Sequence, residues 1–404
     1  MKILVLNAGS SSQKSCLYEF SSIDKQQAKP QLIWEAHIDW TVSDSIAQLT
    51  IVSNGSKRKF SLANNDRQED VEEMLQTLVT GETKVIESLS MIDGVGHRVV
   101  HGGTKYSQAT LITSEVKKTI ADLGVLAPIH NPINLQGINI IEKLLGDIPQ
   151  VAVFDTAFHS NMPTANSIYP LPYKYFTGGI RRYGFHGTSH QYCGDRTAQM
   201  LGQPLDSLKI ITCHLGNGSS LCAIDGGISI DTTMGFTPLE GLMMGTRSGS
   251  IDPAILLYLS KQENLTTQQL DKLLNKESGL KGVSGLSSDL RTIIEQMEGG
   301  NSRAKLAFDT YIHSLRKNIG AMLGSLGGLS ALVFTAGIGE NSPLVRELVC
   351  DGFSFLGLQV DRDKNAHVTD DQNIADENST IPILVIHTEE DLTIAGQCYQ
   401  LLNQ

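Results

Sequence analysis

The chain has 404 residues, of which 40% are hydrophobic and 19% charged, and its formal net charge is −11 at pH 7. This length predicts two or three domains with substantial cores in an ordinary globular protein. The negative charge argues against nucleic acid as a partner, since duplex binding needs a basic face, but a few local arginines would suffice for a small anionic ligand.

The first predicted element is an apolar strand at residues 3–6, followed by the loop Asn7-Ala8-Gly9-Ser10-Ser11-Ser12-Gln13-Lys14 and a returning strand at 16–18. Small residues allow backbone N–H groups to close on an anion, and hydroxyl groups add further donors. The alternative is an ordinary hairpin turn, and the loop lacks Walker A spacing. Lys14 and the later recurrence of this design favour a phosphate-binding loop.

The segment 21–67 is polar and predicts hairpins and loops. Three helices are expected after it, at about residues 69–79, 114–123 and 134–145. A buried strand at 151–154 ends at Asp155, and Pro149 just before this strand predicts a crossing between domains.

The second half repeats the plan of the first. A helix is predicted at 186–201, and a strand at 210–215 then enters a loop of Gly, Asn and Ser at 216–220 before a returning strand at 221–224. Two such loops in separate halves suggest two sites that grip one polyphosphate.

Alternating strands and helices continue to the end of the chain, as is typical of an α/β fold. Thr266 and Gln269 form a capping box, and a long amphipathic helix is expected at about 303–323. A strand at 332–334 enters a glycine loop at 337–341, which is either a third nucleotide-type element or a tight turn, since it lacks the third glycine of a dinucleotide fingerprint. From about His387, an acidic segment leads into a terminal helix.

Two arginines stand among small or apolar residues, Arg98 within 96–103 and Arg247 within 244–249. A guanidinium held in this way suits bidentate recognition of a carboxylate or phosphate, and the alternative is a structural salt bridge. Asp155 and Glu390 each follow a buried strand and are candidates for holding a metal or positioning another group. For both residues the alternative is a capping or solvated role, and it weighs more for Glu390 than for Asp155.

For the remaining polar candidate site residues, two interpretations stay open. His186 lies at a loop-to-helix junction, where it has either a functional or a structural role. Asp289 and Arg291 either touch a nucleotide or cap a helix. The six cysteines show no C-x-x-C pair and no metal spacing, which favours buried thiols in a reducing compartment. With no signal peptide and no long apolar run, we expect a cytoplasmic protein that does not contact a membrane.

Together these segments closely resemble the acetate kinase family, essentially from end to end. The strongest matches are at 7–12, 96–103, 154–159, 181–190, 214–220, 231–249 and 334–343. The resemblance implies an α/β fold of two related ribonuclease-H-like domains, of the actin and sugar-kinase type, with ATP in an interdomain cleft. The expected domains are 1–150 with 387–404, and 151–386.

The resemblance also implies roles, position by position. Asn7 and Glu390 match the magnesium site, where manganese is an alternative metal. The segments that match the ATP/ADP site are Lys14, His214, Leu215, Gly216, Asn217, Gly218, Asp289, Leu290, Arg291, Gly337, Ile338, Gly339, Glu340 and Asn341. The acetate pocket matches Arg98, Val100, Ile129, Phe185 and Pro238, and the catalytic set matches Arg98, Asp155, His186 and Arg247.

The expected reaction is magnesium-dependent phosphoryl transfer from ATP to acetate by direct in-line attack, giving acetyl phosphate and ADP, in a homodimer. Propionate kinase is the close alternative, and an actin-like ATPase switch is the distant one. One departure concerns the metal site: the family's Asn-Glu-Glu-Leu is Glu389-Glu390-Asp391-Leu392 here. Because acetate is already ionised at neutral pH, we expect Asp155 to orient an arginine or the hydrated metal rather than abstract a proton.

Overall fold

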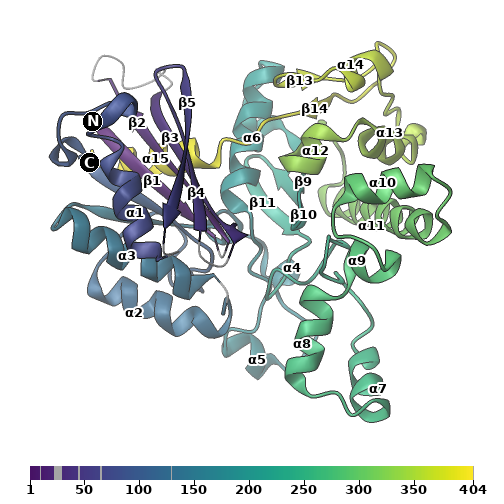
Figure 1. Cartoon of the computed structure of the whole chain (residues 1–404). Coiled ribbons are helices and arrows are strands. Elements are labelled where there is room, and N and C mark those ends of the chain that lie inside the picture. Colours follow the sequence, from purple (N-terminus) through teal and green to yellow (C-terminus); the bar gives the residue numbers. More distant parts are fainter. Residues whose placement is uncertain (10, 22–29, 44–45, 64–65, 129, 404) are drawn as a thin grey trace. The chain divides into compact units, whose positions relative to one another are not determined.

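The computed structural model describes residues 1–9, 11–21, 30–43, 46–63, 66–128 and 130–403 (Figure 1). Contacts divide the chain into two units. The first unit comprises Met1–Ala157 and Glu389–Gln404, and the second comprises Phe158–Thr388.

An eight-stranded sheet forms the first unit. Its strands are, in spatial order, β5 (Ser56–Ala63), β4 (Ile46–Ser53), β3 (Gln31–Ser43), β2 (Ser12–Glu19), β1 (Lys2–Ala8), β6 (Gly94–Val99), β8 (Gln150–Phe154) and β7 (Thr110–Leu111). The helices of this unit are α1 (Arg67–Gln76), α2 (Ser114–Asp122), α3 (Asn131–Leu145) and α15 (Glu390–Leu402).

A six-stranded sheet forms the second unit, in the order β11 (Ile228–Thr232), β10 (Ser219–Asp225), β9 (Lys209–Leu215), β12 (Ala331–Thr335), β14 (Ile383–Val385) and β13 (Gln372–Asn373). Its helices are α4 (Thr164–Ser167), α5 (Tyr173–Thr177), α6 (Gly187–Leu201), α7 (Ala254–Gln262), α8 (Thr267–Lys276), α9 (Gly279–Ser284), α10 (Leu290–Glu298), α11 (Ser302–Leu326), α12 (Ala336–Asn341), α13 (Pro343–Asp351) and α14 (Arg362–Ala366).

The two sheets share one plan, as the repeated loops predict. In the first, β1 pairs antiparallel with β2, which pairs antiparallel with β3, while β6 and β8 continue parallel on the other side of β1. In the second, β9, β10 and β11 form the antiparallel part, and β12 and β14 continue parallel from β9. This equivalence confirms the prediction of two related α/β units.

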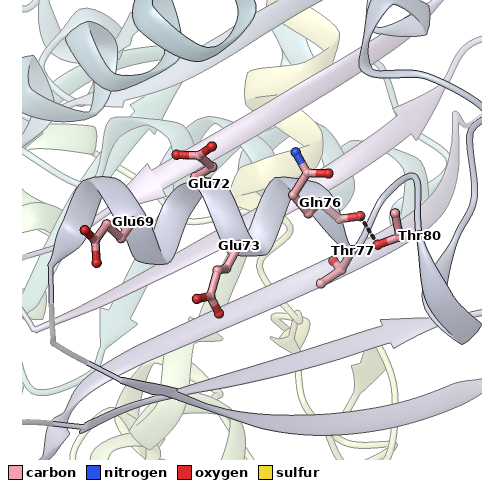
Figure 2. Close-up of a pocket in the computed structure, with 6 residues that line it drawn as sticks. All are labelled: Glu69, Glu72, Glu73, Gln76, Thr77 and Thr80. Carbon is pink, nitrogen blue, oxygen red and sulfur yellow. Dashed lines mark hydrogen bonds between the residues drawn. The ribbon is translucent and has the colours of Figure 1, made fainter.

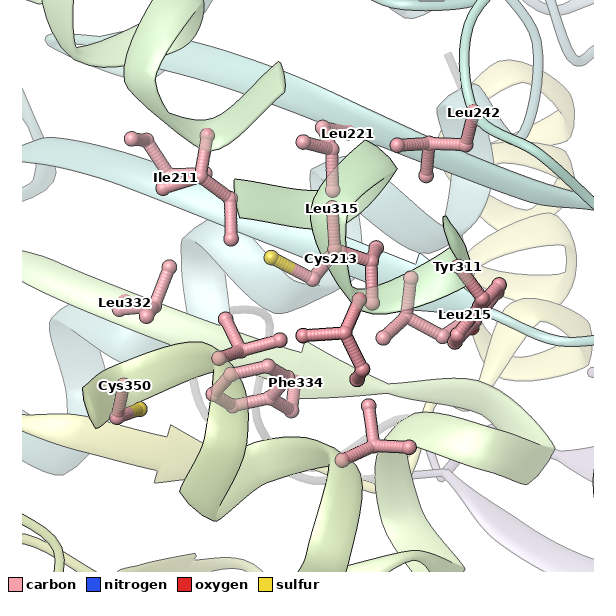
Figure 3. Packing of buried hydrophobic residues seen from close by; sticks show 14 of the residues in the cluster. Ile211, Cys213, Leu215, Leu221, Leu242, Tyr311, Leu315, Leu332, Phe334 and Cys350 are labelled. Atoms are coloured by element: carbon pink, nitrogen blue, oxygen red, sulfur yellow. The ribbon is translucent and has the colours of Figure 1, made fainter. Parts of the chain in front are cut away.

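Each sheet is covered by helices on both faces. In the first unit, α15 packs against β1 through Ile394 and Cys398, and α1 and α3 cover the opposite face (Figure 1). In the second unit, Cys213 of β9 and Phe334 of β12 meet Leu315 of α11 in the largest apolar core (Figure 3). Helix α6 covers the other face of this sheet. Central strands such as β1 and β9 contribute side chains to the cores on both faces of their sheets, because successive side chains along a strand point to opposite faces of the sheet.

Most predicted elements are present, with shifted ends. The capping box of Thr266 and Gln269 is confirmed at the start of α8. The prediction of a glycine loop at 337–341 is wrong, because these residues belong to the short helix α12, which directly follows β12. Within the described ranges, no helix combines the length and apolarity needed to cross a membrane.

The chain leaves the first unit later than residue 150, where the sequence predicts the crossing. The strand β8 pairs with β6, so the chain changes unit only between Ala157 and Phe158. It returns between Thr388 and Glu389, close to the expected position. The difference at the first crossing arises because a buried apolar strand fits either sheet until its partner is known.

Gly96→Ala should destabilise the first unit. A Cβ at Gly96 would lie 2.5 Å from Cys398 Sγ and 2.8 Å from Ile394 Cγ2, so α15 packs too closely on β6 for a methyl group. Overpacking of this kind costs about 1–3 kcal/mol, to be measured by thermal and denaturant unfolding. The control is Gly137→Ala in α3, where the nearest atom is 4.0 Å away and alanine should be neutral or stabilising. Equal stability of both variants would contradict this account of α15.

Candidate active site

In the first unit, Arg98 and Asp155 form a two-pronged ion pair. Arg98 lies near the end of β6 and Asp155 directly follows β8, so parallel pairing puts them at the same edge. Arg98 Nε donates to Asp155 Oδ1 at 2.9 Å and Nη2 donates to Oδ2 at 2.5 Å. Arg98 Nη1 donates to Asn7 Oδ1 at 3.2 Å. Burial acts to lower the pKa of Arg98, but Asp155 and Glu390 outweigh it and raise that pKa.

Glu390, the first residue of α15, lies beside this pair. Burial, with a contribution from Asp391, raises the pKa of Glu390, while Arg98 and a hydrogen bond with Asn7 act in the opposite direction. Lys14 Nζ lies 2.9 Å from Asp391 Oδ2, and Asp391 contributes most to raising the pKa of Lys14 against the effect of burial. Five predicted site residues of this unit therefore lie close together: Asn7, Lys14, Arg98, Asp155 and Glu390.

The donor set around Glu390 fits a divalent cation. Carboxylate and amide oxygens are the ligands that Mg²⁺ prefers in proteins. Asp391 is almost fully buried, and its Oδ1 has no hydrogen-bond partner among the described residues. A buried carboxylate oxygen without a partner is costly unless a cation or water satisfies it. Asp391, named from the sequence only as a departure from the family pattern, is thus a second carboxylate beside Glu390.

In the second unit, His186 occupies a strained position. Its backbone is left-handed, with φ 57° and ψ 28°, immediately before α6. For a non-glycine residue this conformation costs about 1–3 kcal/mol and is found most often at functional sites. The His186 ring stacks on His214 with centroids 4.1 Å apart, and its Nδ1 lies 2.9 Å from Ser220 Oγ.

The loop at 216–218 brings His186 and Arg247 together. A Cβ on Gly218 would lie 3.3 Å from Arg247 Nη1 and 3.8 Å from His186 Nε2. Arg247 Nη1 donates to the carbonyl oxygen of Pro238 at 3.2 Å, and burial lowers the pKa of Arg247. No carboxylate of the described chain lies within ion-pair distance of this guanidinium. A partly buried cation without a counter-ion is suited to receive an anion.

Gly245 joins three predicted segments. Its N–H donates to the carbonyl oxygen of Asn217 at 3.2 Å. A Cβ on Gly245 would lie 2.1 Å from Asn217 Oδ1 and 3.0 Å from the carbonyl oxygen of Ser288. The segment that carries Arg247 therefore packs directly against the loop at 216–218 and against the start of α10.

At the start of α10, Asp289 accepts a hydrogen bond from the backbone N–H of Arg291 at 2.9 Å and forms an ion pair with the exposed Arg291 side chain. This is the capping role that the sequence left open. Leu290 and Leu215 have buried side chains, so only their main chains are available to a ligand.

Arg346 supports the predicted nucleotide segment 337–341 from behind. It is 1% exposed, and its Nη1 donates to the carbonyl oxygens of Gly339 and Glu340, each at 2.8 Å. Burial lowers the pKa of Arg346 to about 10. Sequence reasoning missed this residue, because nothing local distinguishes it from an ordinary helix-surface arginine.

Each unit contains residues that are predicted to line the acid pocket. Val100, in the first unit, and Phe185, in the second, are buried, and Pro238 is partly buried. Ile129 lies outside the described residues.

A shallow cavity of about 500 Å³ lies elsewhere in the first unit, along α1 (Figure 2). It is lined by Glu69, Glu72, Glu73, Gln76, Thr77 and Thr80. Three glutamates would repel a polyphosphate, and the lining includes none of the predicted site residues. A second acidic group, Asp370 and Asp371 with His387, brings potential ligand atoms within 4.8 Å of one another. Arg196 already pairs with Asp371 at 2.6 Å.

Comparison of the sequence with known proteins matches nearly the whole chain to one protein family. The sequence model of the acetokinase family matches residues 2–396. The acetate kinase of Rippkaea orientalis is 61% identical over the full length of both chains, and that of Microcystis aeruginosa is 60% identical over 99% of this chain and all of its own.

Two solved structures have the same fold over 99% of both chains. The Porphyromonas gingivalis acetate kinase has a TM-score of 0.90 at 41% identity. A propionate kinase from Francisella tularensis has a TM-score of 0.89 at 37% identity.

Gly245→Ala should weaken nucleotide binding more than it weakens folding. The added Cβ would displace the Asn217 side chain and with it the loop at 216–218. If this displacement removes one hydrogen bond between the loop and the nucleotide, KM for ATP should rise roughly tenfold. The control is Gly320→Ala in α11, where no atom lies within 4 Å of the added methyl group. An unchanged KM in both variants would show that the packing of 245 against 217 is irrelevant to binding.

Proposed function

The chain belongs to the acetokinase family and is a kinase, and we propose that it transfers the γ-phosphoryl group of ATP reversibly to acetate, giving acetyl phosphate and ADP. The observation that carries this proposal is the contrast between two guanidinium groups. Arg98 is oriented by Asp155, whereas Arg247 is partly buried with no carboxylate partner among the described residues. One suits a carboxylate substrate, and the other suits a phosphoryl group.

Arg98 would bind the carboxylate of acetate. Its hydrogen bonds to Asp155 and Asn7 use three of the five guanidinium N–H groups, which leaves two donors for the acid. Acetate is ionised at neutral pH and needs no general base. Asp155 therefore acts by holding Arg98 in place, and direct in-line attack by the carboxylate on the γ-phosphate follows.

Arg247 and His186 would stabilise the transferring phosphoryl group. Both lie beside Gly218 on the loop that supplies backbone N–H donors. Phosphoryl transfer depends mainly on positioning and on neutralisation of the charge on the equatorial oxygens, and an arginine at this point contributes about 10³–10⁵ in rate. The nucleotide would be held by 214–218, 289–291 and 337–341, with Lys14 as a further contact.

Asn7 and Glu390, with Asp391 as a further carboxylate, would hold Mg²⁺, with Mn²⁺ as an alternative. When bound, the cation would neutralise charge on the phosphates. The buried Asp391 Oδ1 supports this assignment.

Acetate is favoured over propionate because the named relatives at 60% identity and above are acetate kinases. Val100, Phe185 and Pro238 would contact the methyl group. One additional methylene changes binding in an apolar pocket by about 1–3 kcal/mol, so propionate should be a weaker but measurable substrate.

We further propose a cytoplasmic homodimer. All six cysteines are free and buried, which supports a reducing compartment. Helix α7 supports the dimer: Ile255, Leu257 and Tyr258 are 44%, 66% and 63% exposed on one helix. Light scattering should give twice the chain mass of 43.8 kDa, and Leu257→Lys should shift the mass towards the monomer. A monomeric wild-type chain would refute the dimer.

The reaction is tested by trapping acyl phosphate with hydroxylamine in the presence of ATP, Mg²⁺ and acetate, propionate or butyrate. We expect hydroxamate from acetate with the highest kcat/KM. A higher kcat/KM for propionate than for acetate would make propionate the preferred substrate. ATP hydrolysis without hydroxamate from any acid would instead indicate a nucleotide-dependent switch of the actin type.

Asp155→Asn tests whether this residue orients or transfers a proton. The amide cannot accept both hydrogen bonds from Arg98, so kcat should fall about 10²–10³-fold. Because no proton is transferred, kcat of both proteins should stay flat between about pH 6 and 8. A wild-type profile that rises with pH through one ionisation, absent in the variant, would identify Asp155 as a general base.

A further inference from the structure

His186 is the start of a chain of hydrogen bonds that runs into the interior of the second unit. Its Nδ1 lies 2.9 Å from Ser220 Oγ, and Ser220 Oγ lies 2.8 Å from His190 Nε2. The other ring nitrogen of His190, Nδ1, lies 2.7 Å from Thr212 Oγ1. Ser220, His190 and Thr212 are completely buried. Ser220 ends the loop at 216–220 that the sequence predicts, but the sequence assigns none of these three side chains an individual role.

The direction of the chain follows from its inner end. The hydroxyl group of Thr212 has one side-chain partner in the described part of the protein, His190 Nδ1. A buried hydroxyl group that does not donate loses its hydrogen bond to water without compensation, so Thr212 donates to His190 Nδ1. His190 Nδ1 is then an acceptor and carries no proton.

The protonation state of His190 determines the direction of its hydrogen bond to Ser220. Burial and the nearby rings of His159 and His214 lower the pKa of His190 well below its usual value, so the ring is neutral with a single N–H. Since Nδ1 accepts, the proton is on Nε2 and is donated to Ser220 Oγ. Ser220 has one proton of its own, which is left for His186 Nδ1.

We propose that Thr212, His190 and Ser220 form a positioning chain that makes His186 Nδ1 an acceptor and so keeps the ring proton on Nε2. His186 then acts on the transferred phosphoryl group as an N–H donor that carries no charge of its own. This inference rests on the proposed role of His186 in phosphoryl transfer.

The position of Nε2 explains why this tautomer matters. His186 Nε2 is the ring nitrogen on the side of Gly218, where Arg247 Nη1 also lies. An uncharged donor next to Arg247 adds a hydrogen bond to an anion without adding repulsion between two cations. Stacking on His214, whose Nδ1 lies 2.8 Å from Ser189 Oγ, holds the plane of the His186 ring. The left-handed backbone at His186 places the ring where both contacts form.

Ser220→Ala is the first test, with Ser229→Ala as the matched control. Ser229 Oγ lies 2.7 Å from His159 Nδ1, so the control removes an equally buried serine–histidine hydrogen bond outside the chain. Ser220→Ala should lower kcat about 10- to 100-fold, with KM for ATP and acetate changed less than about twofold. Ser229→Ala should lower thermal stability by a similar amount and leave kcat within about twofold. Equal losses of kcat in both variants would overturn the proposal.

Thr212→Val and Thr212→Ser test the direction of the chain at its inner end. Valine has nearly the shape of threonine but no hydroxyl group, so kcat should fall, and serine should restore it. No loss of kcat in Thr212→Val would contradict the assigned direction.

The tautomer of His186 is read independently of activity. Long-range ¹H–¹⁵N correlation on histidine-labelled protein should show the proton of His186 on Nε2 in the wild type and a shift towards Nδ1 in Ser220→Ala. A proton on Nδ1 in the wild type would refute the chain, even if acetate is phosphorylated. The expected tautomer without hydroxamate formation would leave the chain intact and refute the proposed reaction instead.

Discussion

Parallel pairing of the central strands is the constraint on which both half-sites depend. Because β1, β6 and β8 run in one direction, Asn7, Arg98 and Asp155 come to the same edge of the first sheet. In the second unit, β9 and β12 do the same for His214 and the segment 337–341. Residues far apart in the chain thus become neighbours, and the tight strand–loop–strand turns lie at these same edges.

The charges at the two half-sites are arranged differently. In the first unit, Arg98 is balanced by Asp155, and Lys14 is balanced by Asp391, so cations and carboxylates hold one another in fixed positions. In the second unit, Arg247 has only neutral hydrogen-bond partners among the described residues. His186 and His214 near it form hydrogen bonds with the hydroxyl groups of Ser220 and Ser189. An oriented pair suits recognition of a small acid, whereas an uncompensated charge suits a group that becomes more negative during the reaction.

Supporting residues fix the groups that would meet the substrates. Arg346 holds α12 through two carbonyl oxygens, and Gly245 permits the Arg247 segment to touch Asn217. Ser220 and His190 set the ring of His186 in the same manner. All of them act through contacts between segments, so the effect on catalysis that we propose for them would come from geometry rather than from their own chemistry.

The sequence by itself determined the local features. Apolar strands, Gly/Ser loops and the Thr266 cap depend on residues close together in the chain, which is why the repeated strand–loop–strand design and most helices were predictable. It also marked Arg98 and Arg247, because a charged residue among small or apolar neighbours stands out, whereas His186, at a loop-to-helix junction, was left open between a functional and a structural role. Only the tertiary structure decided that β8 joins the first sheet, that Asp155 pairs with Arg98 and that His190 reaches Ser220. These pairings join residues 30 to 57 positions apart, and strand pairing and buried hydrogen bonding, not local pattern, select such partners.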